Sequence, residues 1–286
     1  MDVHTAEASL DVPANKNHDA YYVPGLQRGL RVLEMVAAAP GPLTVSEVAE
    51  RLSLTRSSAF RLIYTLRDMG FLDAVPNAKS VCLGPRVLNI GFAYLARMDM
   101  LEIARPDLEL LRDRTNVTAH FAIRDGRELL YLSCVQTRSG FLSTMNIGAR
   151  LPVHATPMGW LLLADLPPAE LSALLAEIDL APMTEQTPRN QAALLRRIAE
   201  AAASGRVISR GIVERGGSSI SAPIRDRDGR VVAAIDIAGP DSAFDLAEFG
   251  TRYATEVVEA AARISHRLGY GGHAPLVSVD KAGVRS

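Results

Sequence analysis

The sequence predicts an α+β fold in two parts, a small N-terminal winged helix-turn-helix and a larger mixed α/β domain, joined by a helix. Apolar residues recur at helical spacing in three short segments between residues 24 and 68. From residue 117 onward the apolar period changes to two, and helical segments alternate with these strand-like runs. At 286 residues the chain is long enough for two domains, each with a core of its own.

Composition is that of an ordinary globular protein, with 48% hydrophobic and 22% charged residues. The formal net charge of −1 gives no sign of a nucleic-acid partner for the chain as a whole. Between Pro24 and Arg97, however, nine Lys and Arg residues outnumber five Asp and Glu residues. This local excess of positive charge favours DNA binding weakly.

The two cysteines, Cys82 and Cys134, have neither the pattern of a disulfide framework nor the spacing of metal ligands. They favour a reducing cytoplasm, and we expect no metal and no other cofactor. No apolar run approaches the roughly 18 residues that span a bilayer, and the N-terminus lacks a signal peptide's basic start and apolar core. We therefore expect a cytoplasmic protein with no membrane partner.

Both ends of the chain look unstructured, because residues 1–21 are polar and irregular and residues 271–286 begin with a Gly-rich run. We expect them to be disordered tails. Between them we place the winged helix-turn-helix at residues 22–84, the linker helix at 85–100 and the second domain at 101–270.

The three N-terminal helices have recognisable starts and ends. The first starts at Pro24 and ends at the Pro-containing run 39–42, which cannot continue a helix. The second opens with Thr44-Val-Ser-Glu47, the sequence of a capping box. The third starts near Thr55. The predicted inward face of the first helix consists of Leu26, Leu30, Leu33 and Ala37.

The third helix has an apolar stripe around Ala59 and Leu66, and a polar face crowded at its N-terminal end. Such a helix, after two short helices and a tight turn, is typical of a recognition helix in the major groove. Its free N–H groups favour a nearby phosphate. Two strand-like runs, 71–74 and 81–83, flank a turn and predict a wing. A plain structural three-helix unit is the alternative interpretation. The predicted DNA-binding residues are Arg28, Thr44, Thr55, Arg56, Ser57, Ser58, Arg61 and Lys79.

A further helix begins at Gly84-Pro85, with Pro at its first position, and runs to about Met98. Its apolar face needs a partner, so we expect residues 85–100 to serve as a dimerisation helix as well as a linker. Leu101–Arg114 then opens the second domain as an amphipathic helix. The apolar face of the linker consists of Val87, Leu88, Phe92 and Leu95.

The second domain is predicted as a mixed antiparallel sheet backed by helices, an α+β domain of sensory, GAF-like type. The hairpin signal Arg124-Asp-Gly126 lies between the first two strands. Expected strands are 117–123, 128–135, 140–146, 207–212, 219–224 and 231–238. Expected helices are 157–164, 168–178, 190–204 and 243–268.

Little in the sequence supports a catalytic function. Ser143, Ser219, His154 and Asp236 include the residue types of a hydrolase, but the chain has no Gly-x-Ser-x-Gly elbow and no phosphate-binding Gly-rich loop. His120 and His154 have no Cys or His at a chelating spacing, which favours structural or polar pocket roles. We expect no enzyme and no catalytic residue.

A binding pocket is better supported. Thr156-Pro157 is a strong helix start, with Thr as N-cap and Pro at the first helical position. Free N–H groups there would favour a carboxylate ligand. An ordinary capped helix is the alternative interpretation.

Four segments resemble the DNA-binding half of the IclR family in order and spacing: 25–33, 43–52, 55–62 and 83–86. In the second half, 148–156, Ala222-Pro223 and 228–235 resemble the same family, so the likeness covers about residues 22–268. Two positions depart from the family pattern: Phe60 stands where His is frequent, and Val81-Cys82 replaces a Tyr-containing strand. The resemblance implies a DNA-binding transcription regulator with a ligand-binding second domain.

The resemblance also implies an effector site at the loop before the 157–164 helix, the helix start and two central strands. Ser219 stands where Cys is frequent, Trp160 replaces a common Lys, and Asp236 replaces a small hydroxyl residue. Tyr94-Leu, 135–138 and Arg150-Leu-Pro resemble regulators of aromatic-acid catabolism, so a hydroxylated aromatic carboxylate is the expected effector. The implied effector-binding residues are Gly140, Ser143, Pro157, Met158, Trp160, Ser209, Gly217, Ser219, Asp236 and Ala238.

We therefore expect a dimer, or a dimer of dimers, that binds a pseudo-palindromic operator in double-stranded DNA under the control of a small organic acid. Two alternatives stay open. One is a ligand-insensitive DNA-binding protein whose second domain only oligomerises. The other is an enzyme on a sensory-domain scaffold.

Overall fold

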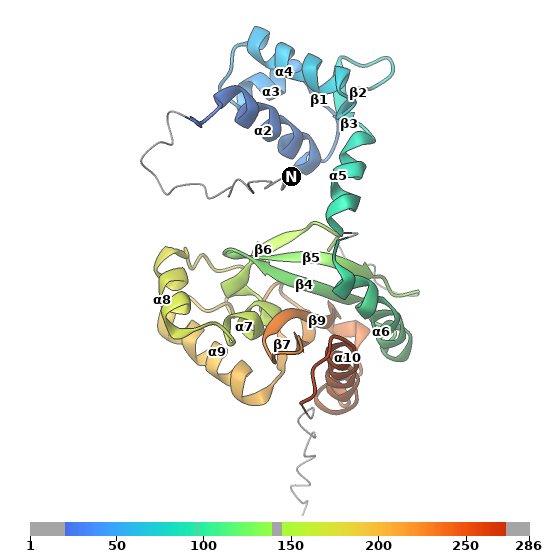
Figure 1. The fold of residues 1–286 in the computed structure, drawn as a ribbon, viewed down its shortest axis with the longest axis vertical. Coiled ribbons are helices and arrows are strands. Elements are labelled where there is room, and N and C mark those ends of the chain that lie inside the picture. Colours follow the sequence, from blue (N-terminus) through green and yellow to red (C-terminus); the bar gives the residue numbers. More distant parts are fainter. Residues whose placement is uncertain (1–20, 96, 139–144, 273–286) are drawn as a thin grey trace, which may run out of the picture. The chain divides into compact units, whose positions relative to one another are not determined.

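The computed structural model describes residues 21–95, 97–138 and 145–272 and divides the chain into two compact units (Figure 1). The first unit ends at Tyr94 and the second begins at Leu95. This division lies inside the stretch predicted as the linker. Over the described ranges, no helix is long and apolar enough to cross a membrane.

The first unit is a winged helix-turn-helix, as predicted. Its helices are α2 (Pro24–Ala38), α3 (Val45–Arg51) and α4 (Arg56–Asp68). Its small antiparallel sheet has the order β1-β3-β2, in which β2 (Leu72–Ala74) and β3 (Ser80–Leu83) form the wing. The remaining strand is β1 (Leu43–Thr44), which pairs with the other edge of β3.

Local hydrogen bonds fix where α3 and α4 begin. Thr44 Oγ1 accepts from the Glu47 amide at 3.3 Å, and Glu47 Oε2 accepts from the Thr44 amide at 2.7 Å. The predicted capping box is therefore present. At the start of α4, Thr55 Oγ1 accepts from the Ser58 amide at 3.2 Å.

The inward face of α2 differs from the prediction. Leu26 and Leu30 are 63% and 52% exposed, and Ala37 is also exposed, so the expectation that they face the core is wrong. The buried residues are Val32 and Val36. Apolar residues occupy two sides of this helix, and only packing against α4 and β3 decides which side is buried.

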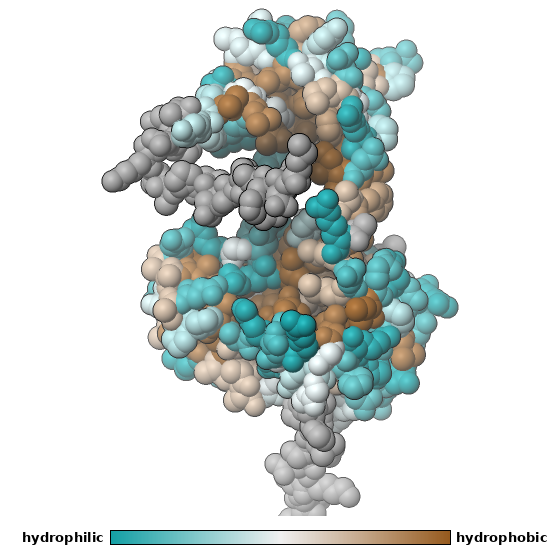
Figure 2. All heavy atoms as spheres, viewed as in Figure 1, coloured by the Kyte–Doolittle hydropathy of each residue, from teal (hydrophilic) through white to brown (hydrophobic). Residues whose placement is uncertain are grey.

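Helix α5 (Arg86–Leu95) follows the wing and has no buried residue among those described. Pro85 immediately precedes the helix instead of occupying its first position. Leu88 and Phe92 are 55% and 61% exposed. Figure 2 shows the resulting hydrophobic surface along α5.

The second unit contains an antiparallel sheet of six strands in the order β6-β5-β4-β9-β8-β7. The strands β5 (Glu128–Val135), β4 (Ala119–Asp125), β9 (Val231–Pro240) and β8 (Gly217–Arg225) agree with the prediction within a few residues, as does β7 (Val207–Arg210).

The edge strand β6 (Arg150–Pro152) was missed in the sequence, since three residues carry no readable alternation. It pairs with β5 through Leu129 and Leu151. The strand expected at 140–146 lies largely outside the described residues, and Met145 and Asn146 are not in a strand.

Helices cover both faces of this sheet (Figure 1). On one face α6 (Asp99–Thr115) and α10 (Ala254–Arg267) pack over β4, β8 and β9. On the other, α7 (Pro157–Leu163) lies against the sheet, with α8 (Pro168–Glu177) and α9 (Gln191–Ser204) outside it. The helix expected at 243–268 is interrupted: a 3₁₀ turn, η2 (Asp241–Ala243), and a π-helical turn, η3 (Phe249–Tyr253), precede α10.

The period-two pattern of β9 decides which side chains face α7. Ile235 and Ile237 are fully buried against α6 and α10. Asp236 and Ala238, which alternate with them, line a cavity on the α7 face.

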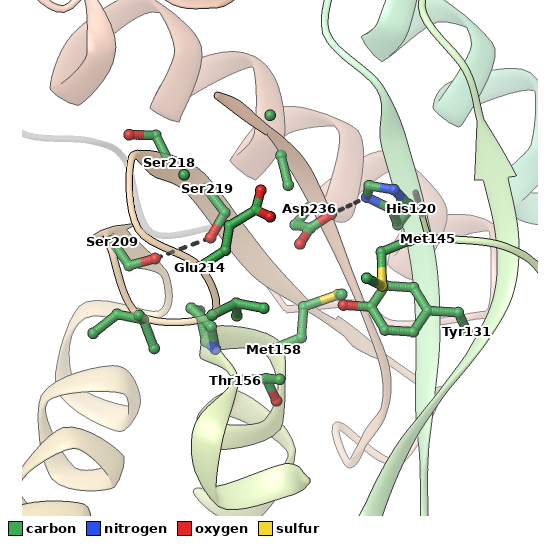
Figure 3. Close-up of a pocket in the computed structure, with 16 residues that line it drawn as sticks. His120, Tyr131, Met145, Thr156, Met158, Ser209, Glu214, Ser218, Ser219 and Asp236 are labelled. Atoms are coloured by element: carbon green, nitrogen blue, oxygen red, sulfur yellow. Dashed lines mark hydrogen bonds and ion pairs between the residues drawn. The ribbon is translucent and has the colours of Figure 1, made fainter. Parts of the chain in front are cut away.

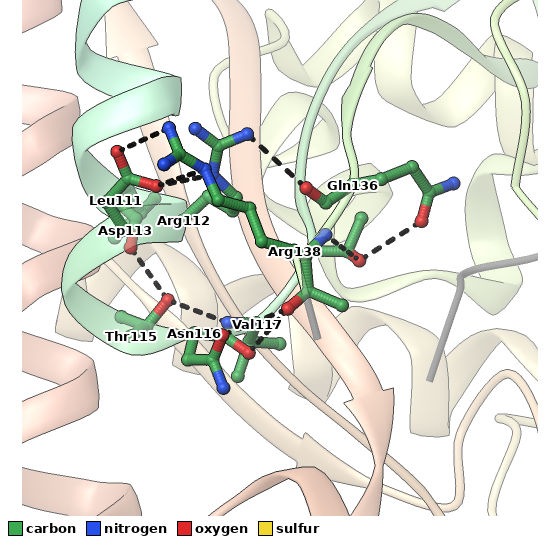
Figure 4. A network of polar contacts seen from close by, with 10 residues as sticks. Leu111, Arg112, Asp113, Thr115, Asn116, Val117, Gln136 and Arg138 are labelled. Carbon is green, nitrogen blue, oxygen red and sulfur yellow. Dashed lines mark hydrogen bonds and ion pairs between the residues drawn. The ribbon is translucent and has the colours of Figure 1, made fainter. Parts of the chain in front are cut away.

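A polar network joins the end of α6 to the sheet (Figure 4). Asn116 adopts a left-handed conformation with φ of 55°, which ends α6. Its carbonyl oxygen accepts from Thr137 Oγ1 at 3.0 Å, beyond the end of β5. Thr115 Oγ1 donates to the Leu111 carbonyl at 2.7 Å. These bonds fix the entry into β4 relative to the exit from β5.

Candidate functional site

The first unit has a surface hollow between α4 and the wing. Four of the predicted residues line the hollow: Thr44, Arg56, Ser57 and Lys79. Ser58 and Arg61 are exposed on α4 outside it. Ala59 and Ile63 are buried in the core of the first unit, as the apolar stripe predicts, and Ile63 also lines the hollow.

Two predicted residues have other surroundings. Thr55 caps α4, and its hydroxyl donates to Ser58 Oγ at 2.9 Å. Arg28 is exposed on α2 and does not line the hollow.

The hollow also contains residues that the sequence analysis did not select, namely Phe60, Tyr64 and Arg67. Helical spacing places them on one stripe of α4 with Arg56, at i, i+4, i+8 and i+11. This helical spacing could have indicated from the sequence that the three residues share a face with Arg56.

The second unit has a cavity between the sheet and the start of α7 (Figure 3). The space inside it measures about 680 Å³, open solvent included. Seven of the predicted effector-binding residues line it: Pro157, Met158, Ser209, Gly217, Ser219, Asp236 and Ala238. Gly140 and Ser143 lie outside the described residues.

The deepest polar feature of the cavity is a buried ion pair. His120 Nδ1 and Asp236 Oδ1 are 2.8 Å apart, with side-chain exposures of 1% and 7%. Burial by itself lowers the pKa of His120, but the charge and hydrogen bond of Asp236, with a smaller contribution from Cys134, raise it to about 9. His120 is therefore a cation at neutral pH.

Tyr131 lies beside this pair, with its ring edge-on to the His120 ring at a centroid distance of 5.5 Å. Burial and the Asp236 carboxylate raise the pKa of Tyr131 well above its usual value, so its hydroxyl stays protonated and able to donate. In Figure 3 the hydroxyl points toward Met158.

The start of α7 offers fewer donors than the sequence suggested. Pro157 has no N–H, and Thr156 Oγ1 accepts from the Gly159 amide at 3.2 Å. This leaves the Met158 amide, at the second helical position, without an acceptor inside α7. The helix start therefore offers fewer donors than predicted, because Pro157 has no N–H and Thr156 already accepts from the Gly159 amide.

The opposite wall consists of β7, β8 and the loop between them. Ser209 and Ser219 share a hydrogen bond of 2.9 Å between their hydroxyls. Ser218 donates to Asp241, which also pairs with Arg210. Glu214, from the loop, projects over Gly217, where an added Cβ would lie 2.7 Å from Glu214 Cγ.

Trp160 is not at the cavity, and the expectation that its ring lies beside a ligand is corrected. It is 1% exposed and packs on the far side of α7 with Leu194 and Ile198. Its Nε1 donates to the His154 carbonyl at 2.7 Å, and Arg197 lies over its ring at 5.6 Å. Trp160 follows Met158 by two residues, which is about 200° around a helix, so Met158 faces the cavity while Trp160 faces α9.

Tyr131, Met145 and Glu214 line the cavity although the sequence did not predict them there, and His120, expected to be a structural or polar pocket residue, also lines it. His120 had a signal in the alternation of β4, where it stands between the buried Ala119 and Phe121. No pattern in the sequence indicated Glu214, because it lies in the loop between β7 and β8, where neither helical nor strand periodicity predicts the direction of a side chain. Within the described ranges, no cluster of His, Cys, Asp and Glu is suited to hold a metal ion.

Comparison with known protein families identifies the family of the chain that carries these two sites. The IclR helix-turn-helix domain matches residues 25–76, and the bacterial transcriptional regulator IclR C-terminal domain matches residues 92–266. The chain belongs to the IclR family. The resemblance inferred from the sequence motifs is confirmed, and the protein is a DNA-binding transcription regulator.

Individual IclR-family proteins match over nearly the whole chain. The HTH-type transcriptional regulator XynR of Escherichia coli strain K12 is 28% identical over 248 residues, which are 87% of this chain and 98% of XynR. The crystal structure of a transcriptional regulator from Rhodococcus sp. RHA1 has 33% identity and a TM-score of 0.76, covering 86% of this chain and 98% of that one.

A third match is the crystal structure of an IclR homolog from Microbacterium hydrocarbonoxydans complexed with 4-hydroxybenzoate. It has 27% identity and a TM-score of 0.74, and it covers 85% of this chain and 98% of that chain. The IclR C-terminal family and XynR are both described as transcriptional regulators.

Proposed function

We propose that this IclR-family regulator binds its operator under the control of a small organic molecule in the cavity of the second unit. The observation that carries the proposal is the buried His120–Asp236 pair, whose carboxylate lines the cavity. A buried charge pair costs more to desolvate than apolar residues of similar size, so a pair kept beside a cavity favours a ligand-binding role.

For the effector we propose a small aromatic acid that carries a hydroxyl group. Asp236 offers an acceptor for the hydroxyl, while Tyr131, Met158 and Ile212 offer apolar contact for a ring. The Met158 amide and the hydroxyls of Ser209 and Ser219 would hold the carboxylate. The carboxylate must then lie away from Glu214, since like charges repel. The Microbacterium relative's complex with 4-hydroxybenzoate supports this class of ligand.

We also propose that the protein acts as a dimer, or a dimer of dimers, on a pseudo-palindromic operator in the cytoplasm. The motive is α5, whose Leu88 and Phe92 are more than half exposed. A second copy that covers this face would set two recognition helices at a fixed spacing. Sedimentation of wild type against Leu88→Lys tests it, and a monomeric wild type at full operator affinity contradicts it.

The effector proposal is tested by thermal stability and operator binding measured together. Benzoate, 4-hydroxybenzoate and an aliphatic oxo-acid form the panel, with Ser219→Val as a cavity variant and Ser204→Val, on α9, as its matched control. We expect 4-hydroxybenzoate to raise the melting temperature and change operator affinity in wild type and the control, but not in Ser219→Val.

Two results would favour the alternatives. If no member of the panel stabilises the protein while operator binding persists, a ligand-insensitive regulator is favoured. If the stabilising compound is recovered chemically changed, an enzymatic second domain is favoured.

A further inference from the structure

Two large aromatic side chains stand exposed on the recognition helix. Phe60 and Tyr64 are 54% and 61% exposed. Their ring centroids are 6.3 Å apart with an interplanar angle of 33°, so the rings lie against one another on the surface. Together they form a continuous apolar surface, and an exposed apolar patch that is rimmed by polar residues can mark an interaction site.

The surroundings of these rings are positively charged. Arg56 and Arg67 lie on the same stripe of α4, and Lys79 of the wing lines the same hollow. None of the described residues that line the hollow is acidic. A rim of cations around an apolar centre suits a polyanion with an apolar group on its surface.

Double-stranded DNA has such a group in its major groove. The C5 methyl of thymine projects there, and every other distinguishing group on the base edges is a hydrogen-bond donor or acceptor. Phe60 has no donor or acceptor, so it can recognise a base only by apolar contact. The arginines beside it can bind phosphates and the acceptors of guanine.

We propose that Phe60, supported by Tyr64, is a specificity-determining residue that recognises thymine in the operator through its C5 methyl group. DNA binding by the family implies a helix in the major groove but not which base Phe60 selects. The proposal commits the face around Phe60 to DNA. A protein partner or a second copy on this face is an outcome that the experiment can show.

The test uses the full chain and two pools of randomised duplexes of roughly 30 base pairs, enough for two half-sites one helical turn apart. One pool is synthesised with thymine and the other with uracil, which differs only by the missing methyl. After selection, the affinity for each preferred duplex is measured in both forms by fluorescence anisotropy. The proteins are wild type, Phe60→Ala, Phe60→Leu and Arg61→Ala.

We expect wild type to bind the thymine form about fourfold more tightly for each methyl that Phe60 contacts. Phe60→Ala should bind both forms equally, and Phe60→Leu should keep part of the preference. Arg61→Ala is the matched control, because it should weaken both forms and leave their ratio unchanged.

The wild-type comparison changes only the DNA, so equal affinity there overturns the proposal even if a variant fails to fold, while Phe60→Leu provides a second variant that assigns a preference to Phe60. Equal affinity of wild type for both forms, or an undiminished preference in Phe60→Ala, overturns the proposal while sequence-specific binding stands. A changed self-association of Phe60→Ala with an unchanged ratio overturns it in favour of a contact between copies. If wild type enriches no sequence from either pool, sequence-specific DNA binding itself fails as well.

Discussion

His120 on β4 and Asp236 on β9 form a 2.8 Å ion pair on directly opposed residues of neighbouring strands, almost completely buried at the cavity wall. The cationic form of His120 is favoured in the folded protein because Asp236 outweighs the effect of burial. In the unfolded chain His120 has an ordinary histidine pKa. The pair therefore couples folding to pH.

Replacing Asp236 with Asn should remove the stabilisation of the His120 cation and leave burial, which opposes protonation, as the main effect on His120. The pKa of His120 is raised from 6.5 to about 9 on folding, which corresponds to a stabilisation on the order of 3 kcal/mol. Because the folded-state pKa is the higher one, the stabilisation is complete below pH 6.5 and disappears as pH rises through about 9. We expect Asp236→Asn to be less stable than wild type at neutral pH and closer to it at high pH.

Urea unfolding of the full chain across this pH range measures the effect. His266→Gln, at an exposed histidine on α10, is the matched control. Parallel stability profiles for wild type and Asp236→Asn would show that the pair contributes nothing.

Arg61 and Lys79 should differ in how they affect DNA binding. Arg61→Ala should cost on the order of 1–3 kcal/mol on the selected operator and relax the preference at one base pair. Lys79→Ala should weaken all sequences alike and reduce the slope of log affinity against log salt by about one.

Fluorescence anisotropy over a range of salt concentrations distinguishes the two effects. Arg215→Ala serves as control, since Arg215 is 81% exposed in the second unit and pairs with Glu185. An Arg56→Ala, Arg61→Ala double variant with wild-type affinity and salt dependence would refute the assignment of α4.

Gly159 should not tolerate a side chain. A Cβ there would overlap the Val153 carbonyl oxygen and lie 2.6 Å from Thr156 Oγ1, the atom that caps α7. We expect Gly159→Ala to lower the free energy of unfolding of the second unit by about 1–3 kcal/mol. Gly250→Ala, with nothing within 4 Å of the new methyl, is the control. Equal melting temperatures for the two variants would contradict the packing described for α7.

Trp160, the single tryptophan, should report burial and not cavity occupancy. Its ring is 1% exposed and faces α9, so its emission should be blue-shifted and resist quenching by acrylamide. Filling the cavity should leave this emission nearly unchanged. A Trp160→Phe, Met158→Trp variant should instead respond to a ligand, because Met158 lines the cavity. Strong acrylamide quenching of wild type would place Trp160 elsewhere.

The sequence by itself determined the features that depend on neighbouring residues. The Thr44 capping box, the Thr55 and Thr156 N-caps and the boundaries of β5 follow from contacts within a few residues. The resemblance implied Asp236 and Ala238 as site residues, and the period-two pattern of β9 is consistent with both facing the same side. Family motifs then strengthened the DNA-binding role and added seven of the residues that line the cavity.

Tertiary structure alone decided which face of a helix is buried and which distant residues become partners. The apolar residues of α2 occupy both sides, and packing against α4 and β3 buries Val32 and Val36 rather than Leu26 and Leu30. Trp160 follows Met158 by two residues but faces α9, because the sheet and α9 lie on different sides of α7. His120 and Asp236 are 116 residues apart, and only the pairing of β4 with β9 turns an isolated histidine and an isolated aspartate into a buried ion pair.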